Sequence, residues 1–68
     1  MKVFSPEKLV KAREEAGLTQ FQLAARSGVA QGKISQYENG HTCPSIMKAA
    51  ALADVLGLLV DDFLMEVG

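Results

Sequence analysis

The chain has 68 residues, of which 49% are apolar and 22% charged, so it suits one small globular domain over residues 1–68. Its net charge of −1 argues against strong non-specific binding to nucleic acid. A single cysteine excludes an intrachain disulfide and favours a reducing, cytoplasmic location. No apolar run approaches the ~20 residues of a membrane span, and the polar start does not resemble a signal peptide.

A first helix is predicted from Pro6 to about Ala16. Ser5 supplies a capping hydroxyl, proline is favourable at the first helical position, and Glu7 adds an acid to the first turn. Gly17 then provides the left-handed residue that commonly ends a helix.

Residues 19–40 indicate two short helices joined by a tight turn. Thr19, with Gln22 three residues later, has the pattern of a capping box, which starts the second helix. Gly28 ends that helix within the turn. The third helix is predicted over about 31–38, before an Asn-Gly pair that readily adopts positive φ.

Two further helices complete the prediction. Pro44 and Ser45 open the fourth helix and Gly57 closes it. Its inward face is expected to hold Ile46, Ala49, Leu52, Ala53 and Leu56. A short last helix is expected from about residue 60, with Val60, Phe63, Leu64 and Val67 on one face. No segment has the pattern of a strand, so five helices with short connections predict a compact all-α fold.

The third helix divides into an inward and an outward face. Ile34 and Tyr37 project to one side, and the other side carries small and amide residues: Gln31, Gly32, Ser35 and Gln36. Glutamine amides both donate and accept hydrogen bonds, which matches the major-groove edge of adenine. Taken alone, such a face is more often simply solvated. However, Ala30 in place of a capping hydroxyl and Gly32 in the first turn both weaken the helix, which favours a ligand at this edge.

In this pattern the sequence resembles the Cro and phage-repressor type of helix-turn-helix domain, the XRE-like family. The matching residues run in order and cover about three quarters of the chain. They are Arg13, Gly17-Leu18-Thr19-Gln20, Leu23-Ala24, Gly28-Val29, Ile34, Glu38-Asn39-Gly40, Pro44-Ser45, Leu52-Ala53 and Leu56-Gly57. The resemblance implies a five-helix, lambda-repressor-like fold whose second helix crosses the DNA backbone and whose third enters the major groove.

The family pattern also implies roles for individual residues. The positions that correspond to DNA contacts are Gln20, Gln31, Gly32, Lys33, Ser35, Gln36, Asn39 and Gly40. Among them, Gln20, Asn39 and Gly40 correspond to positions near phosphates, and the others to base-reading positions or their flanks. Arg13 and Glu38 correspond to a partly buried ion pair between the first helix and the end of the third, which agrees with the inward direction of Glu38.

The sequence departs from the family pattern in places. Ala30 stands where a hydroxyl is usual and Gly32 where a polar side chain is usual, so readout at one step is lost or replaced by DNA shape. Phe21 is unusual at a partly exposed position: it fits a gap against the first helix, which we favour, or a sugar or protein contact. His41 and Cys43 are too few for a zinc site, so we expect no metal or cofactor.

These observations predict a sequence-specific DNA-binding transcriptional regulator, a repressor whose partner is double-stranded DNA. Two alternatives stay open: an antitoxin-type regulator that binds a partner protein, and a helix-turn-helix interaction module that has lost DNA binding. The titratable groups form no catalytic set, which argues against an enzyme. Because one such domain reads few base pairs, we expect a homodimer through the C-terminal helix and the loop before it, where Leu59 and Met65 are surplus apolar residues.

Overall fold

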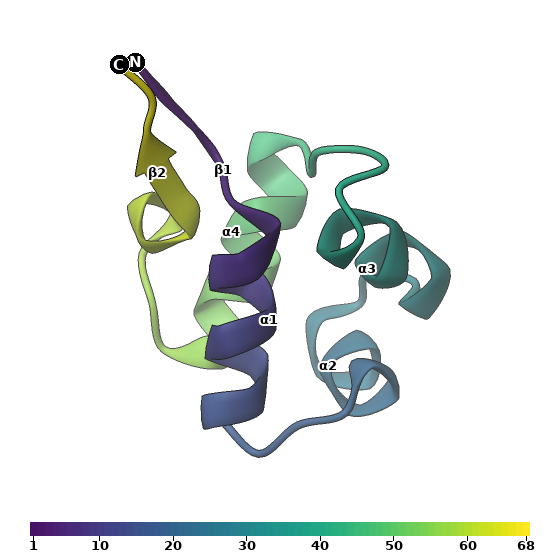
Figure 1. The fold of residues 1–68 in the computed structure, drawn as a ribbon. Helices are drawn as coiled ribbons and strands as arrows, with labels where there is room; N and C mark the ends of the chain where they lie inside the picture. The colour runs from purple at the N-terminus through teal and green to yellow at the C-terminus, as the bar shows by residue number, and fades with distance from the viewer.

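The computed structural model describes residues 1–68 as four α-helices, one 3-10 turn and a two-stranded sheet (Figure 1). In chain order these are β1 (Lys2–Phe4), α1 (Pro6–Glu15), α2 (Gln20–Ser27), α3 (Gln31–Glu38), α4 (Ile46–Leu56), the 3-10 turn η1 (Val60–Phe63) and β2 (Leu64–Glu66). The helices α2 and α3 pack to one side of α1 and α4, and η1 with the sheet lies to the other. None of the helices is long and apolar enough to span a membrane.

Side-chain caps start three of the four α-helices, as their sequences predict. Ser5 before α1 and Ser45 before α4 each accept a hydrogen bond from the N–H three residues on, at 3.3 and 3.2 Å. Before α2, Thr19 accepts from the Gln22 N–H at 3.1 Å, and the Gln22 side chain accepts from the Thr19 N–H at 2.9 Å. Local bonds therefore fix where these helices begin.

One hydrophobic core draws on every helical element. The side chains with no exposed surface come one from each of α1, α2, α3, α4 and η1: Leu9, Leu23, Ile34, Leu52 and Phe63. Around them lie Leu18, Val29, Tyr37 and Ala53, each less than a tenth exposed. Fully burying one large apolar side chain contributes about 1.5–3 kcal/mol. Because the elements share these contacts, the domain has one core.

The predicted last helix, and with it the count of five helices and the absence of strands, is wrong. After the single turn η1 the chain extends as β2 and pairs antiparallel with β1, with Phe4 opposite Leu64. Ser5 N–H donates to Phe63 O at 2.8 Å at the start of this pairing. A strand of three residues is too short to show alternation, and its partner lies at the other end of the chain. The fold is mostly helical, with four α-helices and a small two-stranded sheet.

Two expectations about apolar side chains are also corrected. Phe21, for which a gap against the first helix was favoured, is 71% exposed. It lies two positions before the buried Leu23, which is about 200° around a helix, so α2 turns Phe21 away from the core. Ile46, expected on the inward face of α4, is 70% exposed because the buried part of α4 begins only at Ala49.

Candidate nucleic-acid interface

A tight turn fixes the angle between α2 and α3. Gly28 ends α2 with a φ of 76°, the left-handed conformation that glycine tolerates best. The Ser27 hydroxyl accepts the Val29 N–H at 3.2 Å, and the Val29 side chain is buried. With Leu23 before the turn and Ile34 after it also buried, α3 is held as a ridge on the side of the domain away from the sheet (Figure 1).

The outer side of α3 carries the small and polar residues that its pattern indicated. Ile34 and Tyr37 face the core and are 0% and 4% exposed. The residues on the solvent side are Gln31 and Ser35, which are half-buried, and Gly32, Lys33 and Gln36, which are exposed. No large apolar residue interrupts this face, so it can offer hydrogen bonds along its whole length.

Arg13 of α1 and Glu38 at the end of α3 form a bidentate ion pair. Arg13 Nε lies 2.7 Å from Glu38 Oε2, and Arg13 Nη2 lies 3.1 Å from Oε1. The two side chains are only 14% and 5% exposed. The hydrogen bond to Glu38 outweighs desolvation and raises the pKa of Arg13 above its usual value, so the guanidinium stays charged. The pair ties α1 to α3 from beneath the outer face.

Gln20 extends this ion pair to the outer face of α3, a link that the sequence did not reveal. Its side-chain N–H donates to Glu38 Oε1 at 2.9 Å, and its carbonyl oxygen accepts from the Gln31 side chain at 2.8 Å. The family pattern implied a phosphate contact for Gln20, and one of its two amide N–H donors is still free for it. No spacing signals an amide pair eleven residues apart, because only the angle between α2 and α3 brings the two side chains together. The fold thereby fixes the orientation of the Gln31 amide.

The first turn of α3 is open in two respects. Ala30 occupies the N-cap position and provides no side-chain hydrogen bond to the first turn. Beyond its own stretch of helix, a Cβ added to Gly32 would meet no protein atom within 4 Å, so packing inside the domain does not require glycine there. Free N–H groups and a bare stretch of backbone therefore face outward from this turn.

Asn39 and Gly40 continue the same surface beyond the end of α3. Both are exposed, and the Asn39 side chain donates to the Ser35 hydroxyl at 3.4 Å. Gly40 has a φ of 75°, which again favours glycine. The structure therefore brings the eight predicted contact residues onto α2, α3 and the turn that follows α3.

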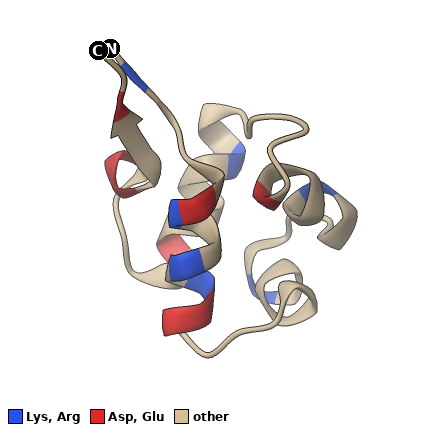
Figure 2. Cartoon of the chain, viewed as in Figure 1, with Lys and Arg blue, Asp and Glu red and all other residues tan.

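Charge is distributed unevenly between this surface and the rest of the domain. Figure 2 shows the acidic and basic residues concentrated on α1 and the terminal segments. The cations of α2 and α3 are Arg26 and Lys33, and their one acid, Glu38, is neutralised by Arg13. The outer face of α3 is therefore polar but carries little net charge.

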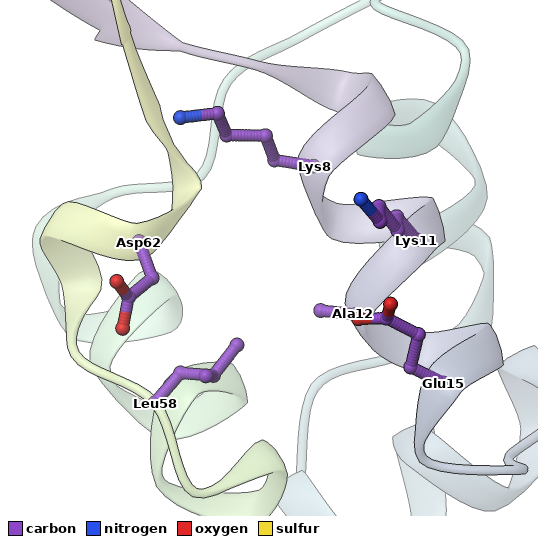
Figure 3. Close-up of a pocket in the computed structure, with 6 residues that line it drawn as sticks. All are labelled: Lys8, Lys11, Ala12, Glu15, Leu58 and Asp62. Atoms are coloured by element: carbon purple, nitrogen blue, oxygen red, sulfur yellow. The ribbon is translucent and has the colours of Figure 1, made fainter.

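A surface groove of about 260 Å³ lies between α1 and the segment formed by η1 and the turn before it (Figure 3). It is lined by Lys8, Lys11, Ala12, Glu15, Leu58 and Asp62. The lysines project from the α1 wall and Asp62 from the opposite wall. Since α3 contributes no residue to it, the groove is separate from the polar face. No cluster of three or more His, Cys, Asp or Glu residues in the structure could hold a metal ion.

Comparison with known proteins gives a consistent set of matches. The profile of the helix-turn-helix family matches residues 9–63, from α1 to the end of η1. An uncharacterized HTH-type transcriptional regulator, y4dJ of Sinorhizobium fredii, is 40% identical over 48 residues, which is 71% of this chain. The match spans 62% of that relative's length.

Solved structures of the regulator SinR are similar in fold. SinR in its complex with the SinI protein superposes with a TM-score of 0.81 and 27% identity, over 85% of this chain and 57% of that one. A second structure shows SinR, the master regulator for biofilm formation, in complex with DNA. It superposes with a TM-score of 0.78 and 28% identity, over 81% of this chain and 89% of that one.

Proposed function

Because this chain belongs to the Cro and phage-repressor type of helix-turn-helix transcriptional regulators, we propose that it binds DNA sequence-specifically and represses transcription. The observation that carries the proposal is the outer face of α3, which is polar, solvent-facing and fixed from beneath by Arg13, Glu38 and Gln20. In this family such a helix enters the major groove. The SinR complex with DNA supports the proposal, since that protein is similar over 81% of this chain.

The outer face of α3 then reads base edges. Gln36 is exposed and can pair bidentately with adenine, while Gln31 offers an amide that Gln20 already orients. Lys33 reaches a guanine edge or a phosphate from the flank. At Gly32 the lack of a side chain lets the α3 backbone approach the bases closely, which explains a glycine that the domain itself does not need.

The remaining predicted residues contact the phosphate backbone. Gln20 retains a free amide N–H at the start of α2, and Asn39 with Gly40 lies exposed beyond the end of α3. These groups hold the domain in register and carry no sequence information. With Lys33 and Arg26 as the cations of α2 and α3, few counterions are released, so the salt dependence of binding is shallow.

The proposed regulator works as a homodimer through its C-terminal edge (residues 58–66), which consists of the turn before η1, η1 itself and β2, and stands in place of the predicted last helix and the loop before it. Within this edge Phe63 is buried, and Leu59 projects into solvent with 73% of its area exposed. Lys11 on one wall of the groove and Asp62 on the other give the edge both signs of charge (Figure 3). A surface that carries an exposed leucine and both signs of charge can pair with its own copy about a twofold axis.

Random-site selection with the purified protein tests DNA binding, and we expect a site with twofold symmetry. Gln36→Ala should weaken binding by ~1–3 kcal/mol and relax the preference at one base pair. Lys33→Ala should weaken binding to all sequences and reduce the salt slope by about 1. The matched control is Lys48→Ala, which removes a lysine from α4 and should leave the slope unchanged. If neither α3 variant changes DNA affinity, α3 is not the reading helix.

Analytical sedimentation, with and without the selected DNA, tests the dimer. Leu59→Lys should give a monomer with an unchanged melting temperature, because Leu59 is exposed in the isolated chain. A wild-type protein that stays monomeric at tens of micromolar on its DNA contradicts the homodimer. A second protein that co-purifies with the wild type and not with Leu59→Lys would instead mean that this edge binds a partner protein, as in an antitoxin-type regulator. The likeness to SinR in its complex with SinI favours that alternative.

A further inference from the structure

Phe21 is the one aromatic side chain that the fold leaves exposed. Phe63 and Tyr37 are in the core, Phe4 packs on it, and Phe21 is 71% accessible to solvent. The other large exposed apolar residues lie on α4, in the turn before η1 or near the chain ends: Ile46, Met47, Leu59, Met1, Met65 and Val67. Phe21 is therefore the one large apolar side chain that is exposed on the helix-turn-helix unit.

The position of Phe21 on α2 places its ring near the expected path of DNA. Phe21 follows Gln20, whose side chain is bonded to both Glu38 and Gln31 of α3. The first turn of α2 is thus fixed relative to the reading helix. Aromatic side chains in a helix point back over the preceding turn, so the ring leans toward the start of α2. That end of α2 meets the DNA backbone when α3 lies in the major groove.

We propose that Phe21 packs its ring against a deoxyribose of the DNA backbone beside the phosphate that Gln20 contacts. The inference rests on the proposed function and adds an apolar contact to it. The sugar is the apolar part of the backbone, and a phenyl ring on it removes apolar surface from water. A protein partner is disfavoured because an interface core needs a cluster of large apolar residues, and the other exposed residues of α2 are Gln22, Ala25 and Arg26.

The contact also suits the charge of this surface. The cations of α2 and α3 are Arg26 and Lys33, so the usual electrostatic component of DNA binding is small. Burying a ring on a sugar strengthens binding without releasing counterions. The proposal therefore separates affinity from salt dependence, which a phosphate contact does not.

The test uses the full chain and the DNA site selected by the wild-type protein. Phe21→Ala should weaken binding by about threefold to tenfold per half-site, because part of the ring's apolar area returns to water. The salt slope should stay unchanged, and hydroxyl-radical footprinting should show lost protection at one sugar in each half-site. Phe21→Leu keeps an apolar side chain, so its DNA affinity should lie between those of the wild type and Phe21→Ala. Met47→Ala is the matched control, since Met47 is 76% exposed on α4.

A change in DNA affinity on Phe21→Ala cannot be due to unfolding, because an exposed side chain contributes little to the core. The melting temperature of Phe21→Ala should therefore match that of the wild type. Equal DNA affinity and an unchanged footprint for Phe21→Ala overturn this inference and leave the proposed function standing. A protein partner lost on Phe21→Ala while DNA affinity is kept overturns it in favour of a protein contact. A wild-type chain that selects no DNA site overturns the proposed function as well.

Discussion

The helix-turn-helix unit (residues 19–40) and the terminal sheet (β1 with β2) are organised by different kinds of contact. In the first, a capping box joins Thr19 to Gln22, three positions along the chain, and a glycine turn joins the two helices. In the second, Val67 N–H donates to Met1 O at 2.9 Å, a bond between the two ends of the chain. Local patterns specify the first region, whereas the second depends on the folded core to hold the two ends of the chain close together.

The two regions also differ in how they use charge. The terminal segments carry exposed ion pairs such as Lys2 with Asp61 at 2.9 Å, whose side chains are 52% and 63% exposed. Exposed pairs of this kind contribute about 0–1 kcal/mol. The helix-turn-helix unit instead depends on the nearly buried pair of Arg13 and Glu38. This ion pair holds α3 from its inner side, so the outer face of α3 needs no charged partner and can carry uncharged amides.

The largest effect is expected at Phe63, whose side chain connects the terminal sheet to the core that the helix-turn-helix unit shares. Phe63→Ala should destabilise the domain by about 3–5 kcal/mol, because a fully buried ring is lost from the core. The ring also packs edge-on to Phe4 of β1, with centroids 6.4 Å apart. Urea denaturation followed by circular dichroism measures the loss. Both regions should unfold in one transition, since they share the core.

Lys2→Ala is the control for Phe63→Ala in the same terminal segments. It removes an exposed ion pair and should change the free energy of unfolding by less than about 1 kcal/mol, with the difference shrinking at high salt. Equal effects of the two substitutions would mean that Phe63 does not join the terminal sheet to the core.

The next effect concerns the support beneath the reading helix. Arg13→Ala should cost about 3 kcal/mol, because it leaves the Glu38 carboxylate nearly buried without its cation. The pKa of Arg13 is raised in the folded protein. The stabilisation that the charged guanidinium provides is therefore complete below the ordinary arginine pKa, and it is lost only when the pH rises through the pKa of the folded state. The cost measured by denaturation should therefore be equal at neutral and mildly alkaline pH.

The double variant Arg13→Met with Glu38→Gln sharpens the same test. It replaces both charges with neutral groups of similar size, so no unpaired charge stays in the interior. We expect it to be more stable than Arg13→Ala alone. If the double variant is less stable, the stranded charge is not the source of the cost.

The smallest expected effect is at Gly32, where one substitution should raise the stability of the domain and lower its DNA affinity. Gly32→Ala should stabilise the domain by up to ~1 kcal/mol, because alanine is the better helix former and its Cβ meets no protein atom. The same methyl group should weaken binding to the selected DNA by standing between the α3 backbone and the bases. Thermal denaturation and a DNA titration on one preparation measure both. Unchanged DNA affinity would show that close approach at Gly32 is not needed.

Sequence patterns predicted the helix-turn-helix unit far better than the ends of the chain. The caps at Ser5, Thr19 and Ser45 and the stop at Gly28 stand where they were predicted, because each depends on residues three or four positions away. The C-terminal helix was predicted wrongly, since the apolar residues after Val60 fit a helix face as well as a strand that pairs at a distance.

For the candidate site, the outward face of α3 followed from helical periodicity, whereas the bonds that orient it did not. Gln20 contacts Gln31 and Glu38 only because the turn at Gly28 sets the angle between α2 and α3. The exposure of Phe21 likewise depends on which face of α2 meets the core.

The sequence by itself therefore determined the helix-turn-helix, its boundaries and the inward and outward residues of α3. Those features are set by bonds and periodicities within a few residues, which a linear pattern contains. The tertiary structure alone decided that the chain ends pair as a sheet, that Phe21 faces solvent and that Gln20 holds Gln31 in place. Each of these joins or separates residues through the shared core, and their positions in space are not written in any local spacing.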